Sequence, residues 1–196
     1  MKKKFNIINR ETAYDGFFKV ERFTLTHDRF DGGTLGPMTR ELFERGEAAA
    51  VLPYDPVNDT VLLIEQFRIG LVDKDDPWQL ELIAGVIEDG EMPSKVAMRE
   101  AQEEADILIE QPVRIHEYYV SPGGSSEKVH LYFARANLHE AGGFFGLGEE
   151  HEDIKVHVIE TDRFFGMLEA GQITNAMTLI AAYWFREHYR SGDLPG

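Results

Sequence analysis

The chain has 196 residues, with 20 lysines and arginines against 35 aspartates and glutamates, giving a formal net charge of −15. Its hydrophobic fraction of 43% and charged fraction of 28% are typical of a folded globular protein and exclude general disorder. The absence of cysteine excludes disulfides, thiolate nucleophiles and thiolate metal sites. The acidic balance disfavours binding to nucleic acid or anionic lipid. We therefore expect no nucleic-acid partner. Because no apolar run approaches the roughly 18 residues that span a bilayer, we also expect a cytoplasmic protein with no membrane partner.

The N-terminal 45 residues are polar and interrupted by glycine and proline, so short stretches such as Phe17–Leu25 are expected to form strands around turns. This segment is too small to bury a core of its own. We therefore expect an N-terminal β-rich subdomain at residues 1–47, which packs on the remainder of the chain or on a second subunit. Residues 48–196 then form the main domain.

The main domain mixes strand and helix signals without a regular alternation of the two. Strands are predicted at 48–53, 60–67, 80–86, 113–120, 128–136 and 154–160, helices at 93–105, 162–170 and 175–189, and a glycine-rich loop at 137–148. The first two strands form a hairpin around the turn Tyr-Asp-Pro-Val-Asn-Asp. This order favours the α+β class, with a mixed sheet between helices.

The helix predicted from Pro93 carries three glutamates at helical spacing. Glu100 and Glu104 are four residues apart and share a face, and Glu103 is three residues from Glu100. Like charges at these spacings destabilise a helix by roughly 0.3 kcal/mol per pair unless a partner offsets them. Two interpretations remain open at this point: a solvated acidic face, or a site for a hard cation such as Mg²⁺ or Mn²⁺, which prefers oxygen ligands.

A longer pattern surrounds these glutamates. It reads Gly, five residues, Glu, seven residues, Arg-Glu, two residues, Glu-Glu, one residue, Asp and an apolar residue, and it occupies residues 85–107. This spacing resembles the Nudix box. One position departs from that box, because Asp106 stands where the family has glycine. A left-handed residue is usual after a helix, and aspartate tolerates this conformation better than most residues do.

Other segments are similar to the ADP-ribose pyrophosphatases of this superfamily, namely residues 40–46, 63–68, 121–124 and 149–157. The resemblance implies the Nudix fold, a mixed sheet sandwiched between helices. It also implies Mg²⁺-dependent hydrolysis of ADP-ribose to AMP and ribose 5-phosphate. In the resembling enzymes the N-terminal segment crosses to the partner subunit, which implies a homodimer.

The same resemblance assigns roles to particular residues. Two or three Mg²⁺ ions per site, or Mn²⁺ in their place, are expected on the backbone carbonyl of Ala84 and on the carboxylates of Glu100, Glu103, Glu104 and Glu152. The catalytic group comprises Glu100, Glu104, a base at Glu150, and Arg99 and Glu91 as residues that orient the carboxylates. The residues expected to bind substrate are Phe17, Arg40, Arg68, Gly85 and Glu127.

The physical need for cations follows from charge. A pyrophosphate would be repelled by a pocket of carboxylates, and divalent cations between the carboxylates and the phosphate oxygens reverse that effect. The box handles only the pyrophosphate, so it leaves open a pyrophosphatase for another nucleoside diphosphate sugar, such as GDP-mannose. Two further alternatives are a non-catalytic nucleotide-binding regulator on the same fold and an acidic interaction domain without a ligand. Retention of all four box glutamates argues against the regulator.

Overall fold

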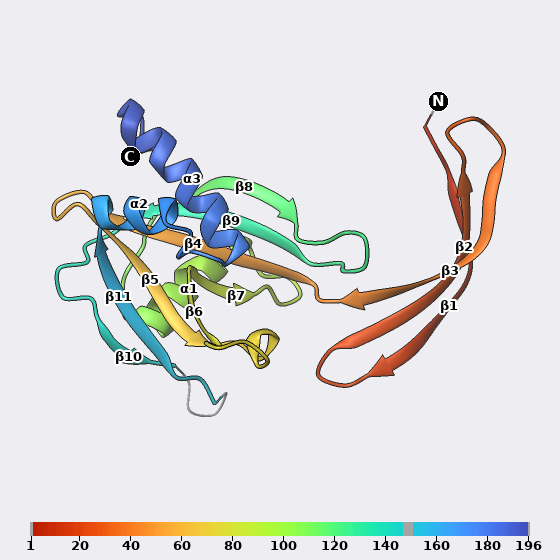
Figure 1. Cartoon of the computed structure of the whole chain (residues 1–196), viewed down its shortest axis with the longest axis horizontal. Helices are drawn as coiled ribbons and strands as arrows, with labels where there is room; N and C mark the ends of the chain where they lie inside the picture. Colours follow the sequence, from red (N-terminus) through yellow and green to blue (C-terminus); the bar gives the residue numbers. More distant parts are fainter. Residues whose placement is uncertain (1, 147–150, 196) are drawn as a thin grey trace. The chain divides into compact units, whose positions relative to one another are not determined.

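A computed structural model describes residues 2–146 and 151–195 of the chain. The chain separates into two compact units, which we describe in turn (Figure 1). The first unit comprises Met1–Glu47 and Tyr118–Lys128, and the second comprises Ala48–Glu117 and Val129–Gly196. Within the described ranges no helix is both long enough and apolar enough to cross a membrane.

The first unit is an antiparallel sheet in the order β1-β2-β3, built from Phe5–Asp15, Lys19–Asp28 and Thr34–Glu44. These strands are longer than the short stretches expected from the sequence. Strand β1 is exposed along its whole length, and none of the unit's described apolar side chains belongs to the buried core. Its buried residue is Glu21, 3% exposed, which is paired with Arg10 and Lys19.

The turn at residues 121–127 belongs to this unit and is hydrogen-bonded to the end of β3. The amide of Phe43 donates to the carbonyl of Gly124 at 2.8 Å, and the amide of Ser126 donates to the carbonyl of Phe43 at 3.1 Å. The segment at residues 121–124, which is one of those similar to the ADP-ribose pyrophosphatases, is therefore held by backbone hydrogen bonds beside the end of β3.

The second unit contains a sheet of eight strands in the order β10-β11-β5-β4-β9-β8, with β6 paired to β5 and β7 paired to β4. Hydrogen bonds from Lys128 to Gly46 and from Ala136 to Tyr54 join the starts and the ends of β4 and β9, so these two strands run parallel. The pairs β10–β11, β11–β5, β4–β5, β4–β7 and β5–β6 are antiparallel. This confirms the predicted mixed sheet. The strands are β4 (Glu47–Asp55), β5 (Thr60–Phe67), β6 (Trp78–Glu81), β7 (Ile83–Val86), β8 (Val113–Tyr119), β9 (Lys128–Arg135), β10 (Gly143–Phe145) and β11 (Ile154–Glu160).

The hairpin of β4 and β5 opens after two residue pairs, and the following segment fills the gap. Strand β6 pairs with the C-terminal half of β5, and β7 pairs with the N-terminal half of β4. The single strand predicted at 80–86 is therefore wrong: Leu82 interrupts it, and its amide donates to the hydroxyl of Thr178 at 3.1 Å. Within the loop predicted at 137–148, residues Gly143–Phe145 form β10, which extends the sheet beyond β11.

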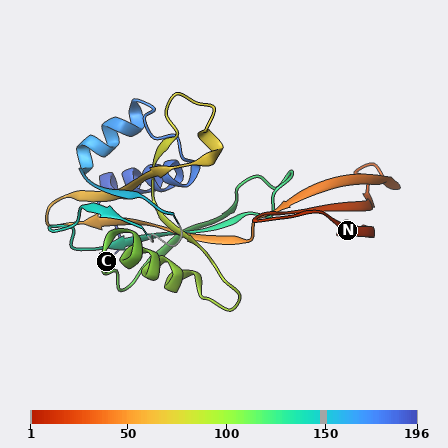
Figure 2. The ribbon, with the colours of Figure 1, turned by 90° about the horizontal axis from the view of Figure 1, so that it is seen from below.

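Helices cover both faces of this sheet (Figure 2). Helix α1 (Pro93–Ala105) lies on one face, and α2 (Thr161–Glu169) and α3 (Ala176–Ser191) lie on the other. A short 3-10 turn, η1 (Ile69–Leu71), lies between β5 and β6. Helix α1 starts with a proline in its first turn, as predicted, and ends at Asp106 in the left-handed conformation, with φ of 50°. Its small buried residues, Val96, Ala97, Ala101 and Ala105, pack into the core and bring the helix close to the sheet.

Candidate active site

Helix α1 presents two of its glutamates to the sheet and a third to solvent. Glu104 is 4% exposed, and the side chain of Glu100 is 13% exposed. The side chain of Glu103 is 37% exposed and lies on the outer side of the helix. The spacing argument that placed Glu100 and Glu104 on one face therefore describes the buried pair. Whether these residues hold metal stays a prediction.

Glu100 occupies the space that a side chain at position 85 would need. A Cβ atom built on Gly85 would overlap the carboxylate and the Cγ atom of Glu100. Gly85 belongs to β7, so the absence of a side chain there allows α1 to lay a carboxylate directly on the strand. The glycine that opens the sequence pattern thus has a steric reason in this structure.

Glu104 is fixed by the neighbouring residue of the same strand. The amide of Ala84 donates to Oε2 of Glu104 at 3.1 Å. In antiparallel pairing the N–H and C=O of one residue point to the same side of the strand. The carbonyl of Ala84 therefore points to the side on which Glu104 lies, as its expected role as a metal ligand requires.

Arg99 connects the glutamates of the pattern to one another. Its Nη1 atom lies 2.8 Å from Oε1 of Glu100 and 2.9 Å from Oε2 of Glu103, and its Nε atom lies 3.8 Å from Oε1 of Glu91. Glu91 also accepts a hydrogen bond from the amide of Glu88 at 2.9 Å, which fixes it in the turn before the helix. Arg99 thus contacts three carboxylates from the side, in an arrangement that suits orientation of these groups.

The pKa values of the buried pair, Glu100 and Glu104, are both raised. The pKa of Glu104 is raised to about 8, chiefly by burial and also by the charges of Glu100 and Glu152. The hydrogen bond from Ala84 and the charge of Arg68 act to lower it. Burial also raises the pKa of Glu100. These carboxylates therefore repel one another in a poorly solvated place, which a cation would relieve.

Glu152 comes from the acidic segment before β11. It is half-buried, and its charge acts on both Glu100 and Glu104. Gly146 has a positive φ of 108° and lies so close to the backbone of Glu152 that there is no room for a Cβ. The predicted base, Glu150, lies outside the described residues.

The donor chemistry fits a hard divalent cation. Glu100, Glu104 and Glu152 offer carboxylate oxygens, and Ala84 offers a carbonyl, which are the donors that Mg²⁺ and Mn²⁺ take. Within residues 2–146 and 151–195, no three acidic or histidine side chains already converge closely enough to enclose an ion. The residues therefore match a metal site in type and in electrostatics.

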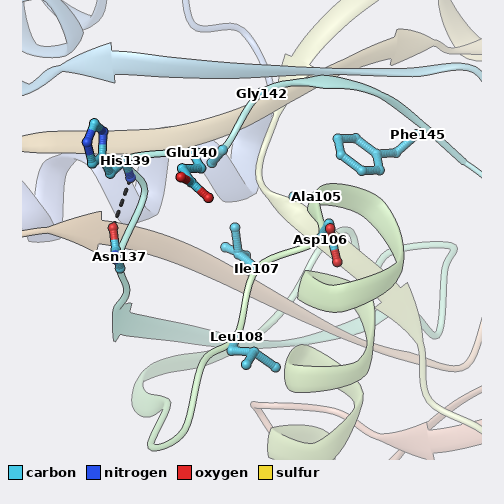
Figure 3. Close-up of a pocket in the computed structure, with 10 residues that line it drawn as sticks. Ala105, Asp106, Ile107, Leu108, Asn137, His139, Glu140, Gly142 and Phe145 are labelled. Atoms are coloured by element: carbon cyan, nitrogen blue, oxygen red, sulfur yellow. Dashed lines mark hydrogen bonds between the residues drawn. The ribbon is translucent and has the colours of Figure 1, made fainter.

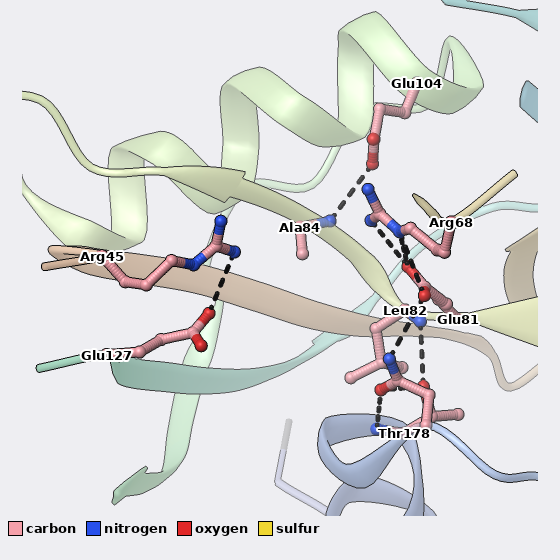
Figure 4. A network of polar contacts seen from close by, with 9 residues as sticks. Arg45, Arg68, Glu81, Leu82, Ala84, Glu104, Glu127 and Thr178 are labelled. Atoms are coloured by element: carbon pink, nitrogen blue, oxygen red, sulfur yellow. Dashed lines mark hydrogen bonds and ion pairs between the residues drawn. The ribbon is translucent and has the colours of Figure 1, made fainter. Parts of the chain in front are cut away.

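Arg68 lies at the end of β5, on the same side as Glu104 (Figure 4). Its guanidinium forms a bidentate ion pair with the buried Glu81 of β6, in which Nε and Nη2 both donate and Nη2 lies 2.7 Å from Oε2. Asn175 also donates to Glu81, at 3.3 Å. Sequence reasoning missed Glu81 and Asn175. A signal for Glu81 was present, since an acid inside an apolar strand must be paired if it is buried.

The three remaining predicted residues belong to the first unit. Phe17 is 95% exposed, and Arg40 is exposed and donates to the carbonyl of Thr39 at 2.8 Å. Glu127 lies 3.4 Å from Nη2 of Arg45, whose guanidinium stacks over an aromatic ring of the same unit. Their roles in binding substrate stay predictions.

A pocket of about 690 Å³ lies at the C-terminal end of α1 (Figure 3). It is lined by residues 105–108, by residues of the segment 137–142 and by Phe145. Asp106, the residue that departs from the Nudix box, is at its edge. None of the residues predicted to bind metal or substrate lines this pocket, so it is separate from the candidate site.

The chain is similar to several known proteins. The model of the NUDIX domain matches residues 44–176. An ADP-ribose pyrophosphatase of Escherichia coli (strain K12) is 41% identical over 191 residues, which is 97% of this chain and 91% of that protein. A GDP-mannose pyrophosphatase of Citrobacter koseri is 31% identical over 188 residues, which is 92% of this chain and 94% of that protein.

Among solved structures, the crystal structure of an "ADP compounds hydrolase" superposes with a TM-score of 0.74 and 21% identity, over 97% of each chain. At this identity the likeness concerns the fold alone. It confirms the expected α+β architecture, with its mixed sheet between helices and its N-terminal antiparallel sheet. The match to the family model and the near full-length identity together confirm the resemblance read from the motif: the chain belongs to the Nudix family.

Proposed function

We propose that this chain hydrolyses the pyrophosphate bond of ADP-ribose, giving AMP and ribose 5-phosphate, with a divalent cation as cofactor. The observation that carries the chemistry is the buried pair Glu100 and Glu104, laid against β7 by Gly85 and fixed by the amide of Ala84. Identity of 41% to ADP-ribose pyrophosphatases, against 31% to a GDP-mannose pyrophosphatase, supports the choice of substrate. Nudix hydrolases typically use a divalent metal.

The carboxylates of the site are the proposed metal ligands. Glu100, Glu104, Glu152 and the carbonyl of Ala84 hold two or three Mg²⁺ or Mn²⁺ ions, with Glu103 as an outer ligand. When bound, these ions supply positive charge that offsets the pyrophosphate and make water more acidic. Arg99 and Glu91 keep the carboxylates oriented through the ion pairs described above.

The chain's own residues carry the other steps. Glu150 takes the proton from the attacking water, and a carboxylate beside cations needs no raised pKa for this task, only correct placement. Arg68 donates to the pyrophosphate, and the backbone at Gly85 borders it. In the proposed homodimer, Phe17 stacks on the adenine and Arg40 adds a positive charge at the partner subunit's site. Glu127 accepts from ribose hydroxyls.

A homodimer formed through the N-terminal subdomain, residues 1–47, is part of the proposal. Several large apolar side chains of the first unit are exposed, and monomers rarely expose many together. They are Phe5, Ile7, Ile8, Tyr14, Phe17 and Phe30. Sedimentation equilibrium at micromolar concentration should give twice the chain mass. A fully active monomer would contradict this part of the proposal.

Product analysis tests the activity. The purified protein is incubated with ADP-ribose or GDP-mannose, each with Mg²⁺ and with EDTA. We expect AMP from ADP-ribose in Mg²⁺ and no product in EDTA. Faster cleavage of GDP-mannose would keep the chemistry and overturn the substrate, and no cleavage of either would favour a nucleotide-binding regulator.

A further inference from the structure

The guanidinium of Arg68 is held on one edge only. Its Nε atom lies 3.1 and 3.0 Å from the two oxygens of Glu81, and Nη2 lies 2.7 Å from Oε2. No hydrogen bond joins Nη1 to another described residue, and the side chain remains 42% exposed. Within residues 2–146 and 151–195, Arg68 therefore has one edge paired with Glu81 and a second edge whose N–H groups have no hydrogen-bond acceptor.

Glu81 is itself held from the opposite side by the first turn of α3. Asn175 donates from Nδ2 to Oε1 of Glu81 at 3.3 Å, while its Oδ1 accepts from the amide and the hydroxyl of Thr178, each at 3.1 Å. The hydroxyl of Thr178 accepts from the amide of Leu82, the residue after Glu81. These four hydrogen bonds and the peptide bond between Glu81 and Leu82 form a closed ring, which fixes the position of Glu81 (Figure 4).

The stability of the fold alone does not explain this ring of hydrogen bonds. Glu81 is 2% exposed, and removing a carboxylate from water offsets much of what an ion pair contributes. Well-packed apolar residues would serve a structural role equally well. What the pair does supply is a fixed orientation of a planar cation, which suits bidentate recognition of phosphate.

The free edge of Arg68 lies in the neighbourhood of the acidic site. The charge of Arg68 lowers the pKa of Glu104, and the charges of Glu104 and Glu152 act on Arg68 in turn. Figure 4 shows the guanidinium between Glu81 and the contact of Ala84 with Glu104. An anion held beside Glu104 is therefore within the field of a cation whose direction is already set.

We infer that Glu81 and Asn175 are positioning residues that orient Arg68 toward a pyrophosphate oxygen of the substrate. The inference rests on the proposed function, because it concerns the same site. It assigns no contact between Glu81 or Asn175 and the substrate. Both act through Arg68, and α3 thereby helps to set the geometry on the opposite side of the sheet from α1.

A double-mutant cycle tests this inference. The variants are Glu81→Gln, Arg68→Ala and the pair combined, with Glu169→Gln as a control that removes the same charge from an exposed ion pair of α2. The readouts are the dissociation constant of the non-hydrolysable α,β-methylene analogue of ADP-ribose, and KM and kcat for ADP-ribose. Circular dichroism and thermal melting establish that each variant is folded.

We expect Glu81→Gln to weaken binding of the analogue and to raise KM about tenfold, the size of one lost charge-assisted hydrogen bond, with a smaller change in kcat. In the Arg68→Ala background the same change should have no further effect, because coupled residues are not additive. Glu169→Gln should behave as the parent. Equal factors for Glu81→Gln in both backgrounds would overturn the inference, as would unchanged binding in the folded single variant.

Asn175→Asp keeps the inference testable if Glu81→Gln does not fold. Aspartate caps a helix as well as asparagine does, so α3 keeps its first turn, but the donor to Glu81 is lost. We expect weaker binding of the analogue, and unchanged binding would count against the inference. If the parent protein neither binds the analogue nor cleaves ADP-ribose, the proposed function itself fails, and this inference fails with it. Failure of the variants alone leaves the function standing.

Discussion

At the scale of single residues, the candidate site depends on how closely α1 approaches β7. Gly85 provides the space for the carboxylate of Glu100, and Ala84 provides the donor for Glu104. The two neighbouring positions of one strand thus fix two successive turns of one helix. The sequence pattern contained both partners, and the structure supplies the reason that the glycine and the glutamates occur together.

Gly85→Ala is predicted to displace Glu100 and to lower kcat/KM by about a hundredfold, the effect of moving a catalytic group by roughly an ångström. Gly70→Ala serves as the matched control, because a Cβ there meets nothing within 4 Å. Steady-state kinetics and thermal melting of both variants make the comparison. Nearly parental kinetics for Gly85→Ala would contradict the steric argument.

The raised pKa of Glu104 predicts the pH dependence of stability in metal-free protein. Its pKa is about 8 in the folded chain against an ordinary value of 4.5, so the folded state holds this proton more tightly. The free energy of unfolding therefore falls as pH rises from about 4.5 to about 8, by about 1.4 kcal/mol for each unit by which the two pKa values differ.

Glu104→Gln removes that titration. In EDTA the variant should melt above the parent at pH 9, and the difference should shrink at pH 5, where both side chains are largely uncharged. Thermal melting at the two pH values provides the measurement. A difference in melting temperature that is the same at both pH values would mean that the burial of Glu104 is not the cause.

At the scale of elements, periodicity and capping signals located most of the main domain. Helix α1 begins at Pro93 and ends at Ala105 as predicted, because proline, apolar spacing and a residue that tolerates positive φ all agree. The break at Leu82 could not be predicted. The run from 80 to 86 looks continuous, and the interruption comes from Thr178, which is distant in sequence.

Thr178→Val tests that interruption. The change removes the acceptor for the amide of Leu82, and both residues are fully buried, so the amide is left without a partner. We expect a loss of about 1–3 kcal/mol in the free energy of unfolding, measured by urea denaturation. Thr178→Ser retains the hydroxyl and should lose much less. Equal losses for the two variants would point to packing instead of the hydrogen bond.

The first unit was the least predictable element, for a physical reason. Strand prediction relies on alternation of buried and exposed residues, and β1 has no buried residue at all. Its partners are fixed by cross-strand hydrogen bonds and by the pairing of Arg10 with Glu21, neither of which leaves a periodic signal. The same limit applies to Glu81 and Asn175, which meet only through the tertiary fold.

At the scale of the whole molecule, the net charge of −15 opposes the approach of an anionic nucleotide. Because salt screens such repulsion over about 10 Å at 0.1 M, kcat/KM for ADP-ribose at saturating Mg²⁺ should rise as NaCl increases from low ionic strength to about 0.1 M. Initial rates at subsaturating substrate give this quantity. A steady fall over that range would show that local positive charge, rather than the overall field, governs encounter.

The amide of Ala84 has one more consequence. It points away from β4 and donates to a carboxylate, whereas most strand amides donate to a backbone carbonyl. Its proton therefore senses the charge on Glu104 through a single hydrogen bond. In a nuclear magnetic resonance spectrum, this one backbone signal should follow the titration of Glu104 and the arrival of a cation, so the active site contains its own spectroscopic reporter without any added label at the side chain.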